Sequence, residues 1–260
     1  MAQFDIAAKN YDSDFTHSAI GKMQRSFVWE YLISEFKIDS KPLKILEINC
    51  GTGADALSFA KIGHQVLATD ISSEMVSIVD EKSNFDNLKT QCISIQNLNK
   101  IDDSFDLIFS NFGGLNCLNT DELSDFAETA NSLLKTDGHF IAVVMTNYCM
   151  MEHLYLAAKF KWKDVFRRNN KQGIPVNVEG EQVHTYYYSP KEFSQLFTQN
   201  FQKKALRPIG HLVPPSYLEN YFKTKKTILQ NLYSLDKLIL KNETCANWSD
   251  HFLIDLEKRK

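Results

Sequence analysis

A glycine turn between two apolar segments constrains the fold of this chain more than any other feature. The first segment is Lys44–Ile48, and it runs into a turn over residues 49–53 that has glycines at positions 51 and 53. Because glycine has no Cβ, a ligand can approach such a turn closely. A helix is predicted to follow, and the N–H groups of its first turn have no acceptors within the helix, so they can bind a ligand at the turn. The second apolar segment, residues 66–70, ends in a carboxylate. The pattern predicts a strand–turn–helix–strand unit that binds a ligand at the turn.

Strands and helices alternate along the first 145 residues. Several of the apolar runs are continuous, as is typical of strands with both faces covered by helices. The pattern therefore predicts an α/β fold with a doubly wound sheet. Strands are expected at 43–48, 65–69, 90–95, 105–110 and 139–145, and helices at 18–36, 54–62, 75–80 and 121–135.

The remainder of the chain has a different rhythm. A length of 260 residues suits one domain with insertions. Residues 1–40 are expected to form an N-terminal helical lid, and residues 147–182 and 212–240 are expected to be cap insertions over the carboxyl ends of the strands. Within this part we expect a helical stretch over 147–180, strands at 183–188, 203–208 and 251–256, and a long helix over 216–240.

Composition excludes several classes of protein. The net charge of −3 gives no global attraction to nucleic acid or to an anionic membrane, so neither is expected as a partner. The five cysteines include no C-x-x-C pair, which argues against a disulfide framework and against a bound metal. No apolar run is long enough for a transmembrane helix, and the first residues lack a secretory pattern, so a cytoplasmic location is expected.

One local segment departs from the overall charge. Lys159, Lys163 and Arg167 are spaced to share one face of a helix. The apolar side of that helix would consist of Ala158, Trp162, Val165 and Phe166. The pattern favours a solvated amphipathic face over contact with an anionic substrate or a membrane surface.

Asp70 points to an adenosine-containing ligand at the glycine turn. It lies seventeen residues after Gly53, where a carboxylate can accept hydrogen bonds from two ribose hydroxyls. Two cofactor classes remain open. The sequence from Gly51 to Ala56 fits the G-x-G-x-x-A form of an NAD or FAD fingerprint. Glu47 instead suits the α-amino group of a methionine moiety, because an unpaired carboxylate on an apolar strand would be costly. A third interpretation has Glu47 binding local backbone only.

Five ordered elements resemble one family. The run from Glu47 to Gly53 resembles the first motif, (E/D)-x-G-x-G-x-G, of class I S-adenosylmethionine-dependent methyltransferases, with Asn49 in place of the first glycine. Residues 66–70 resemble the second motif, and Ile71 to Met75 resemble the segment beside adenine. Residues 104–110 and 135–143 resemble two later strand elements. The opening residues 4–12 and the closing residues 250–256 resemble the ends of small-molecule methyltransferases.

The resemblance implies a Rossmann-like, seven-stranded, mostly parallel sheet with a helical lid insertion, and S-adenosyl-L-methionine as cofactor. Ser94 stands where the family usually has an acid that contacts adenine, so Ile95 or Gln96 is expected to help. The residues implied to bind the cofactor are Tyr11, Glu47, Asn49, Gly51, Gly53, Asp70, Ile71, Met75, Ser94, Ile95, Gln96, Ser110, Asn111 and Phe112.

The resemblance also implies methyl transfer to a small-molecule acceptor by direct in-line displacement. Glu152, His153, His184 and Tyr186 are expected to face the substrate, and either histidine could help a weakly acidic acceptor lose its proton. No catalytic residue is assigned. The alternatives are an oxidoreductase that binds NAD(P) or FAD, and a non-catalytic cofactor-binding subunit.

Overall fold

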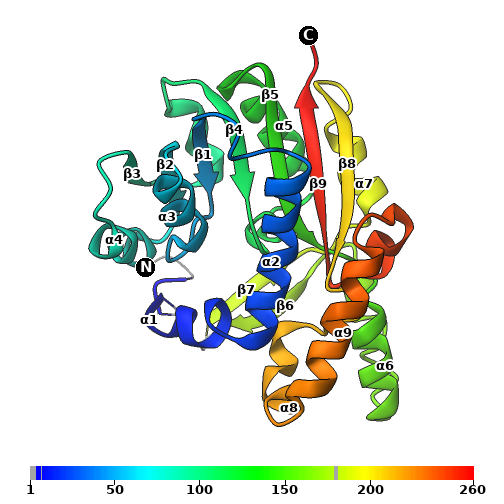
Figure 1. The fold of residues 1–260 in the computed structure, drawn as a ribbon. Helices are drawn as coiled ribbons and strands as arrows, with labels where there is room; N and C mark the ends of the chain where they lie inside the picture. Colours follow the sequence, from blue (N-terminus) through cyan, green and yellow to red (C-terminus); the bar gives the residue numbers. More distant parts are fainter. Residues whose placement is uncertain (1–3, 7, 179–180) are drawn as a thin grey trace.

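The molecule is built on one seven-stranded sheet (Figure 1). The computed structural model describes residues 4–6, 8–178 and 181–260. The strand order is β3-β2-β1-β4-β5-β9-β8, and only β9 runs antiparallel to its neighbours. This confirms the predicted doubly wound, seven-stranded, mostly parallel sheet. The strands are β1 (Lys44–Ile48), β2 (Gln65–Asp70), β3 (Leu88–Cys92), β4 (Phe105–Ser110), β5 (Leu134–Met145), β8 (Phe201–Ile209) and β9 (His251–Lys258).

Helices cover both faces of the sheet, and each face has its own apolar core. On one face Phe27, Phe59 and Leu229 belong to a single buried cluster with the strand side chains, and on the other face Phe126 and Phe193 do so. The first face is covered by α2 (Ala19–Ser34), α3 (Ala54–Lys61), α4 (Ser73–Lys82) and α9 (Lys226–Ile239), and the second by α5 (Thr120–Leu133) and α7 (Pro190–Leu196).

Short elements gather at the end of the sheet where the parallel strands finish (Figure 1). They come from the three segments that the sequence predicts as lids. Residues 1–3, 7 and 179–180, which belong to two of those segments, lie outside the described residues. The elements are α1 (Ala8–Tyr11), α6 (Met150–Ala158), α8 (Glu219–Phe222) and the antiparallel pair β6 (Ile174–Val178) and β7 (Glu181–Thr185).

The predicted helical stretch 147–180 is wrong beyond α6. The helix ends at Ala158, a short 3₁₀ turn follows over Arg167–Asn169, and β6 begins at Ile174. Half-buried Ile174 and Val176 alternate with exposed Pro175 and Asn177, and Val176 pairs with Val183, which is a strand pattern. Lys159, Lys163 and Arg167 therefore do not share a helix face.

Two further boundaries differ from the sequence prediction. The predicted helix 216–240 is divided into a 3₁₀ turn, α8 and α9. The break between α8 and α9 falls at Lys223, Lys225 and Lys226, where like charges repel each other and disfavour a continuous helix. The strand predicted at 90–95 lies earlier, at β3, and residues 95–100 form a 3₁₀ turn. That edge strand has mostly exposed side chains, so its apolar pattern is faint. Among the described residues, no helix is long and apolar enough to cross a membrane.

Candidate cofactor site

The turn after β1 is built from left-handed backbone. Asn49 has φ 54°, Gly51 has φ 54° and Gly53 has φ 79°. A Cβ on Gly53 would lie 2.7 Å from a methyl carbon of Val79, so only glycine fits there. Asn49 is tolerated where the family has glycine, because asparagine enters the left-handed region more readily than other residues with side chains. The Asn49 side chain lies against Gly114, and a Cβ on Gly114 would lie 2.4 Å from the nearest atoms of that side chain.

Glu47 is the most informative residue of the site. It is 2% exposed on β1, and its Oε2 is buried with no hydrogen-bond partner. Burial raises the pKa of Glu47 well above its ordinary value, and the charge of Asp55 raises it further. A buried acceptor without a donor is costly and therefore rare. The charge of Arg25 acts to lower this pKa, but none of the described residues donates a hydrogen bond to Oε2, which could therefore accept one from a ligand cation.

Arg25 is a second residue of the site, and it carries a donor without an acceptor among the described residues. The sequence does not predict its role. Arg25 reaches in from α2, forms an ion pair with Asp55 and lies 5.3 Å from the centre of the Phe112 ring. Its Nε is buried and has no acceptor. Nothing local distinguishes Arg25 from the other polar residues of α2, because its partner lies thirty residues further along the chain.

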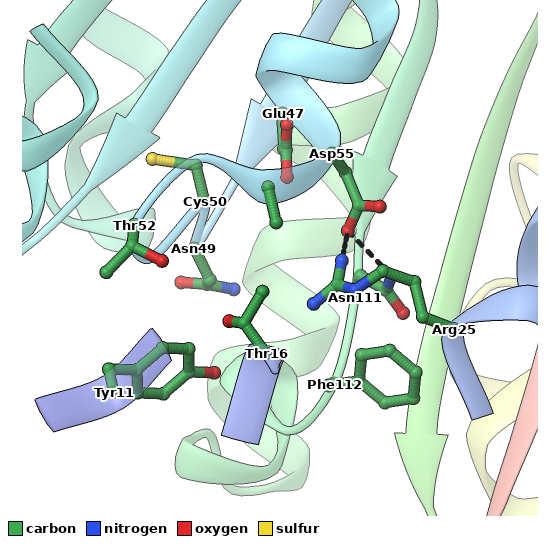
Figure 2. Close-up of a pocket in the computed structure, with 11 residues that line it drawn as sticks. Tyr11, Thr16, Arg25, Glu47, Asn49, Cys50, Thr52, Asp55, Asn111 and Phe112 are labelled. Atoms are coloured by element: carbon green, nitrogen blue, oxygen red, sulfur yellow. Dashed lines mark hydrogen bonds and ion pairs between the residues drawn. The ribbon is translucent and has the colours of Figure 1, made fainter. Parts of the chain in front are cut away.

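Asp55 ties three parts of the site together (Figure 2). Besides Arg25, it accepts hydrogen bonds from Trp29 Nε1 and Asn111 Nδ2, both at 2.8 Å. Asn111 follows β4, so Asp55 joins α2, α3 and the end of β4. The carbonyl oxygen of the Asn111 side chain, Oδ1, stays buried without a partner.

These groups surround one pocket, with about 280 Å³ of empty volume (Figure 2). Tyr11 and Phe112 lie across the pocket from Asp55 in this view. Five of the residues predicted to bind the cofactor line it, namely Tyr11, Glu47, Asn49, Asn111 and Phe112. The other lining residues are Thr16, Arg25, Cys50, Thr52, Ala54 and Asp55.

Tyr11 closes the pocket from the N-terminal segment. Its ring lies 3.6 Å from the position that a Cβ on Gly51 would occupy, and burial raises the pKa of Tyr11 to about 12. Two side chains hold this segment against the turn. Thr52 Oγ1 donates to Asp12 Oδ1 at 2.6 Å, and Lys82 forms an ion pair with the same carboxylate.

Asp70 lies at the end of β2, beside the turn. Its two oxygens accept hydrogen bonds from the backbone N–H groups of Gly51 and Ser72, each at 2.9 Å. Burial raises the pKa of Asp70, while these two N–H donors act to lower it. Each carboxylate oxygen can accept a further hydrogen bond, so both can still receive a ligand hydroxyl.

The residues predicted beside adenine continue from Asp70. Ile71 is 51% exposed although it is aliphatic, and Met75 is a buried residue of α4. On the neighbouring segment Ser94 accepts a hydrogen bond from Asn97 at 2.8 Å, and Ile95 is half-buried. Gln96 is exposed. The exposed side chain of Ile71 is an apolar surface on which a planar base such as adenine could pack.

Ser110 and Phe112 complete the sheet edge after β4. Ser110 is buried and its Oγ accepts a hydrogen bond from Asn49 Nδ2 at 3.4 Å. Phe112 has φ 48°, and its ring packs edge-on against His251 with 5.3 Å between centres. His251, which the sequence prediction did not single out, begins β9, and its Nδ1 lies 3.2 Å from Asp250 Oδ2.

The four residues predicted to face the substrate lie outside the lining of this pocket. Glu152 is fully buried and accepts hydrogen bonds from Arg167, Arg168 and Tyr217. His153 stacks on Tyr148 with 4.0 Å between ring centres, and its Nδ1 lies 2.5 Å from a backbone carbonyl oxygen of its own helix. The substrate-facing role of both residues stays a prediction.

His184 and Tyr186 lie on and just after β7. His184 is exposed, with Nε2 2.6 Å from the carbonyl oxygen of Gln172. Tyr186 is half-buried, and its backbone N–H donates to the carbonyl oxygen of Asn116 at 2.7 Å. The Tyr186 contact places that residue beside the segment that follows β4, whereas His184 contacts the loop before β6. Their role also stays a prediction.

Comparisons with known proteins agree with this geometry. Residues 45–138 match the model of a family described as methyltransferase domain. Over 84 residues the chain is 39% identical to the release factor glutamine methyltransferase of Lactococcus lactis subsp. lactis (strain IL1403), a match that covers 32% of this chain and 30% of that protein. A second curated relative is covered over 49% of its length, so the chain spans less than half of the curated relatives it matches.

Solved structures resemble the chain over nearly its whole length. An S-adenosylmethionine-dependent methyltransferase from Clostridium acetobutylicum ATCC 824 has a TM-score of 0.61 at 16% identity, with 96% of each chain covered. Magnesium protoporphyrin IX methyltransferase from Synechocystis PCC 6803, with bound S-adenosylhomocysteine, has a TM-score of 0.58 at 12% identity, over 98% of this chain and 94% of that one. At these identities the likeness shows the fold.

Family match and fold together confirm the resemblance to class I S-adenosylmethionine-dependent methyltransferases. Residues 45–138 match the methyltransferase-domain model, and S-adenosylmethionine is the cofactor that this resemblance indicates. The dinucleotide oxidoreductase is not favoured, because a dinucleotide would bring a pyrophosphate to the turn beside the buried carboxylate of Glu47.

Proposed function

We propose that this chain transfers the methyl group of S-adenosylmethionine to a small-molecule acceptor. One observation carries the proposal: the pocket presents buried polar atoms of both kinds without partners. Glu47 Oε2 and Asn111 Oδ1 lack donors, and Arg25 Nε lacks an acceptor. An α-amino acid group carries an ammonium and a carboxylate, and would satisfy acceptors and donor together. The methionine portion of the cofactor has such a group.

In this proposal each residue has a task in binding. Glu47 holds the ammonium group and Arg25 holds the carboxylate, while Asp70 accepts hydrogen bonds from the ribose hydroxyls. Ile71 and Met75 pack along adenine, and residues 94–96 contact its edge. Gly51, Gly53 and Ser110 keep the backbone close to the cofactor.

The cofactor supplies a methyl group already activated on a sulfonium, so the protein need only align the acceptor and exclude water. Phe112 and Tyr11 are placed to exclude water from the methionine side. The segments 1–40, 147–182 and 212–240 would act as lids on a single domain, with the acceptor beneath them. Direct in-line displacement then requires no covalent step on the protein.

A small-molecule acceptor is supported by the name of one structural relative, magnesium protoporphyrin IX methyltransferase from Synechocystis PCC 6803. The net charge of −3 supports the absence of a nucleic-acid substrate. A cytoplasmic location is part of the same proposal.

Two ligands separate the roles of Glu47 and Asp70. Methylthioadenosine keeps the adenosine of S-adenosylhomocysteine but lacks its amino-acid group. Glu47→Gln is expected to weaken S-adenosylhomocysteine binding roughly 10- to 100-fold, since a charge-assisted hydrogen bond is lost, and to leave methylthioadenosine binding unchanged. Asp70→Ala is expected to weaken both ligands. Calorimetric titration measures all four combinations.

Two results would contradict the assignment. One is unchanged affinity of Asp70→Ala for both ligands. The other is tighter binding of NADH than of S-adenosylhomocysteine by the unaltered protein. A screen of metabolite acceptors with radiolabelled cofactor would then identify the acceptor.

A further inference from the structure

A basic and aromatic surface lies at the end of the molecule formed by α6 and α8. After α6 the sequence alternates Lys159, Phe160, Lys161, Trp162, Lys163. Phe160 is 80% exposed and Trp162 is 63% exposed, and all three lysines are exposed. The amphipathic helix expected from the sequence would have turned Trp162 inward, but the helix ends before it.

The same end carries a second basic segment, after α8. Residues 223–226 include three lysines, and Tyr221 is 49% exposed beside them. The rings of Tyr155 and Tyr221 lie 6.3 Å apart, and Lys159 and Lys225 both lower the pKa of Tyr221. The two segments are therefore neighbours. We call residues 159–163 and 221–226 together the basic-aromatic end.

The charge of this end is opposite to that of the whole chain. The two segments hold six lysines and no acidic residue, whereas the chain carries a net charge of −3. Among the ion pairs of the described residues, none involves Lys159, Lys161 or Lys163. These lysines are free to meet anionic groups outside the chain.

Backbone geometry turns the aromatic rings outward. Phe160 has φ 56°, a left-handed conformation that bulky residues rarely adopt. Its ring lies edge-on to Trp162 with 6.5 Å between centres, away from the core. Large exposed rings are costly in water unless something covers them.

We propose that the basic-aromatic end docks on an anionic lipid surface. Aromatic rings at the level of the lipid headgroups bury their apolar bodies, while flanking lysines reach the phosphates. The strict alternation of lysine with a large ring supplies both contacts from one turn. The net charge of −3 predicts no membrane partner, but this local surface favours a peripheral one. The inference does not depend on the proposed methyl transfer.

Vesicle binding tests the inference with the full chain. We expect binding to vesicles that contain phosphatidylglycerol to be at least about tenfold tighter than binding to phosphatidylcholine alone, and to weaken in high salt. Trp162 emission is expected to shift to the blue on binding, and Trp162→Phe is expected to abolish that shift. Absence of binding to either vesicle, or equal binding to both, would overturn the inference.

Charge and aromatic variants localise the contact. The triple variant Lys159→Glu, Lys161→Glu, Lys163→Glu is expected to lose vesicle binding at least about tenfold. A matched control, Lys61→Glu, Lys89→Glu, Lys100→Glu, makes the same charge change at exposed lysines elsewhere and is expected to keep it. Phe160→Ala with Trp162→Ala is expected to weaken binding, whereas Leu238→Ala, at another exposed apolar residue, is not.

Two outcomes would reject a lipid surface. Equal loss in the triple variant and its control would mean that only net charge matters. Binding to polyglutamate but not to vesicles would point to an acidic protein instead. Affinity for S-adenosylhomocysteine measured on the same variants is expected to stay unchanged, which separates this test from that of the cofactor site.

Discussion

At the residue scale, the buried Oε2 of Glu47 lowers the stability of the folded protein and at the same time provides an acceptor for a ligand. Glu47 Oε2 is buried without a hydrogen-bond partner among the described residues, and burial holds the pKa of Glu47 well above the ordinary value of 4.5. A carboxyl group with a raised folded pKa binds its proton more tightly in the folded state. Its ionisation therefore costs stability as the pH rises above 4.5 towards the folded pKa.

We predict that Glu47→Gln stabilises the ligand-free protein at neutral pH by roughly 1–3 kcal/mol, because the amide carries no charge to desolvate. Below pH 4.5 the gain is expected to vanish. Denaturant unfolding at several pH values measures it. Glu74→Gln, at an exposed site in the first turn of α4, serves as the control and is expected to lower stability slightly, by less than about 1 kcal/mol, because its charge favours the helix dipole. Equal stability of Glu47→Gln and the unaltered protein at neutral pH would contradict the prediction.

At the element scale, buried ion pairs fasten α6 to the start of β9. Arg168 is 4% exposed, and its guanidinium donates to Glu152 at 2.7 Å and to Asp250 at 2.9 Å. Burial alone would raise the pKa of Glu152, but Arg168 and Arg167 outweigh it and lower that pKa. His251 and Arg168 likewise hold the pKa of Asp250 below its ordinary value, against the effect of burial.

We predict that Glu152→Ala destabilises the fold by about 3–5 kcal/mol, since Arg168 is left buried without that partner. Glu243→Ala, which removes an exposed pair with Lys203 and a weak pair with Arg207 at 3.9 Å, is expected to cost less than about 1 kcal/mol. Carboxylates with lowered folded pKa values stabilise above their unfolded values, so this contribution is expected to fade as the pH falls below 4.5. Urea titrations of both variants at neutral and acid pH test both statements, and a similar loss in the two variants would contradict them.

The same scale shows how far the sequence predicts the elements. The glycine turn and the strands around it are predicted well, because both the glycines and the continuous apolar runs are local signals. The cap is predicted poorly. Gly173 and Pro175 indicate a loop, and this signal hides the alternation of Ile174 and Val176 that is typical of a strand. The helix predicted beyond Ala158 rests only on the spacing of charged and apolar residues.

At the scale of the whole molecule, α2 lies lengthwise across one face and joins distant parts of the chain (Figure 1). Tyr31 donates to Asp255 on β9 at 2.6 Å, and Gln24 donates to Asp250 at 3.0 Å. Arg25 reaches the pocket from the same helix. Half of the candidate site could be predicted from β1, β2 and β4, because their carboxyl ends share one edge. Arg25 could not, since its position depends on long-range packing.

We predict that S-adenosylhomocysteine raises the melting temperature of the protein, because a ligand bound only to the folded state stabilises it. At a hundredfold excess over its dissociation constant the gain is about 2.7 kcal/mol, or roughly 5–10 °C for a chain of this size. NADH at the same concentration serves as the control and is expected to give no shift. A larger shift with NADH would contradict the prediction, and a melting curve followed by fluorescence measures both.

The short N-terminal segment has a consequence for rates. Asp12 contacts Thr52 of the glycine turn and Lys82 of α4, and Ser72 Oγ, just before α4, donates to Asp5 at 2.6 Å. If this segment is a lid, as we propose, ligand exchange requires these contacts to open first. We expect Asp12→Ala to accelerate both association and dissociation of S-adenosylhomocysteine in stopped-flow traces, with a smaller change in their ratio. If so, cofactor residence time is set by two half-buried aspartates outside the lining of the pocket, and it can change while affinity and chemistry stay the same.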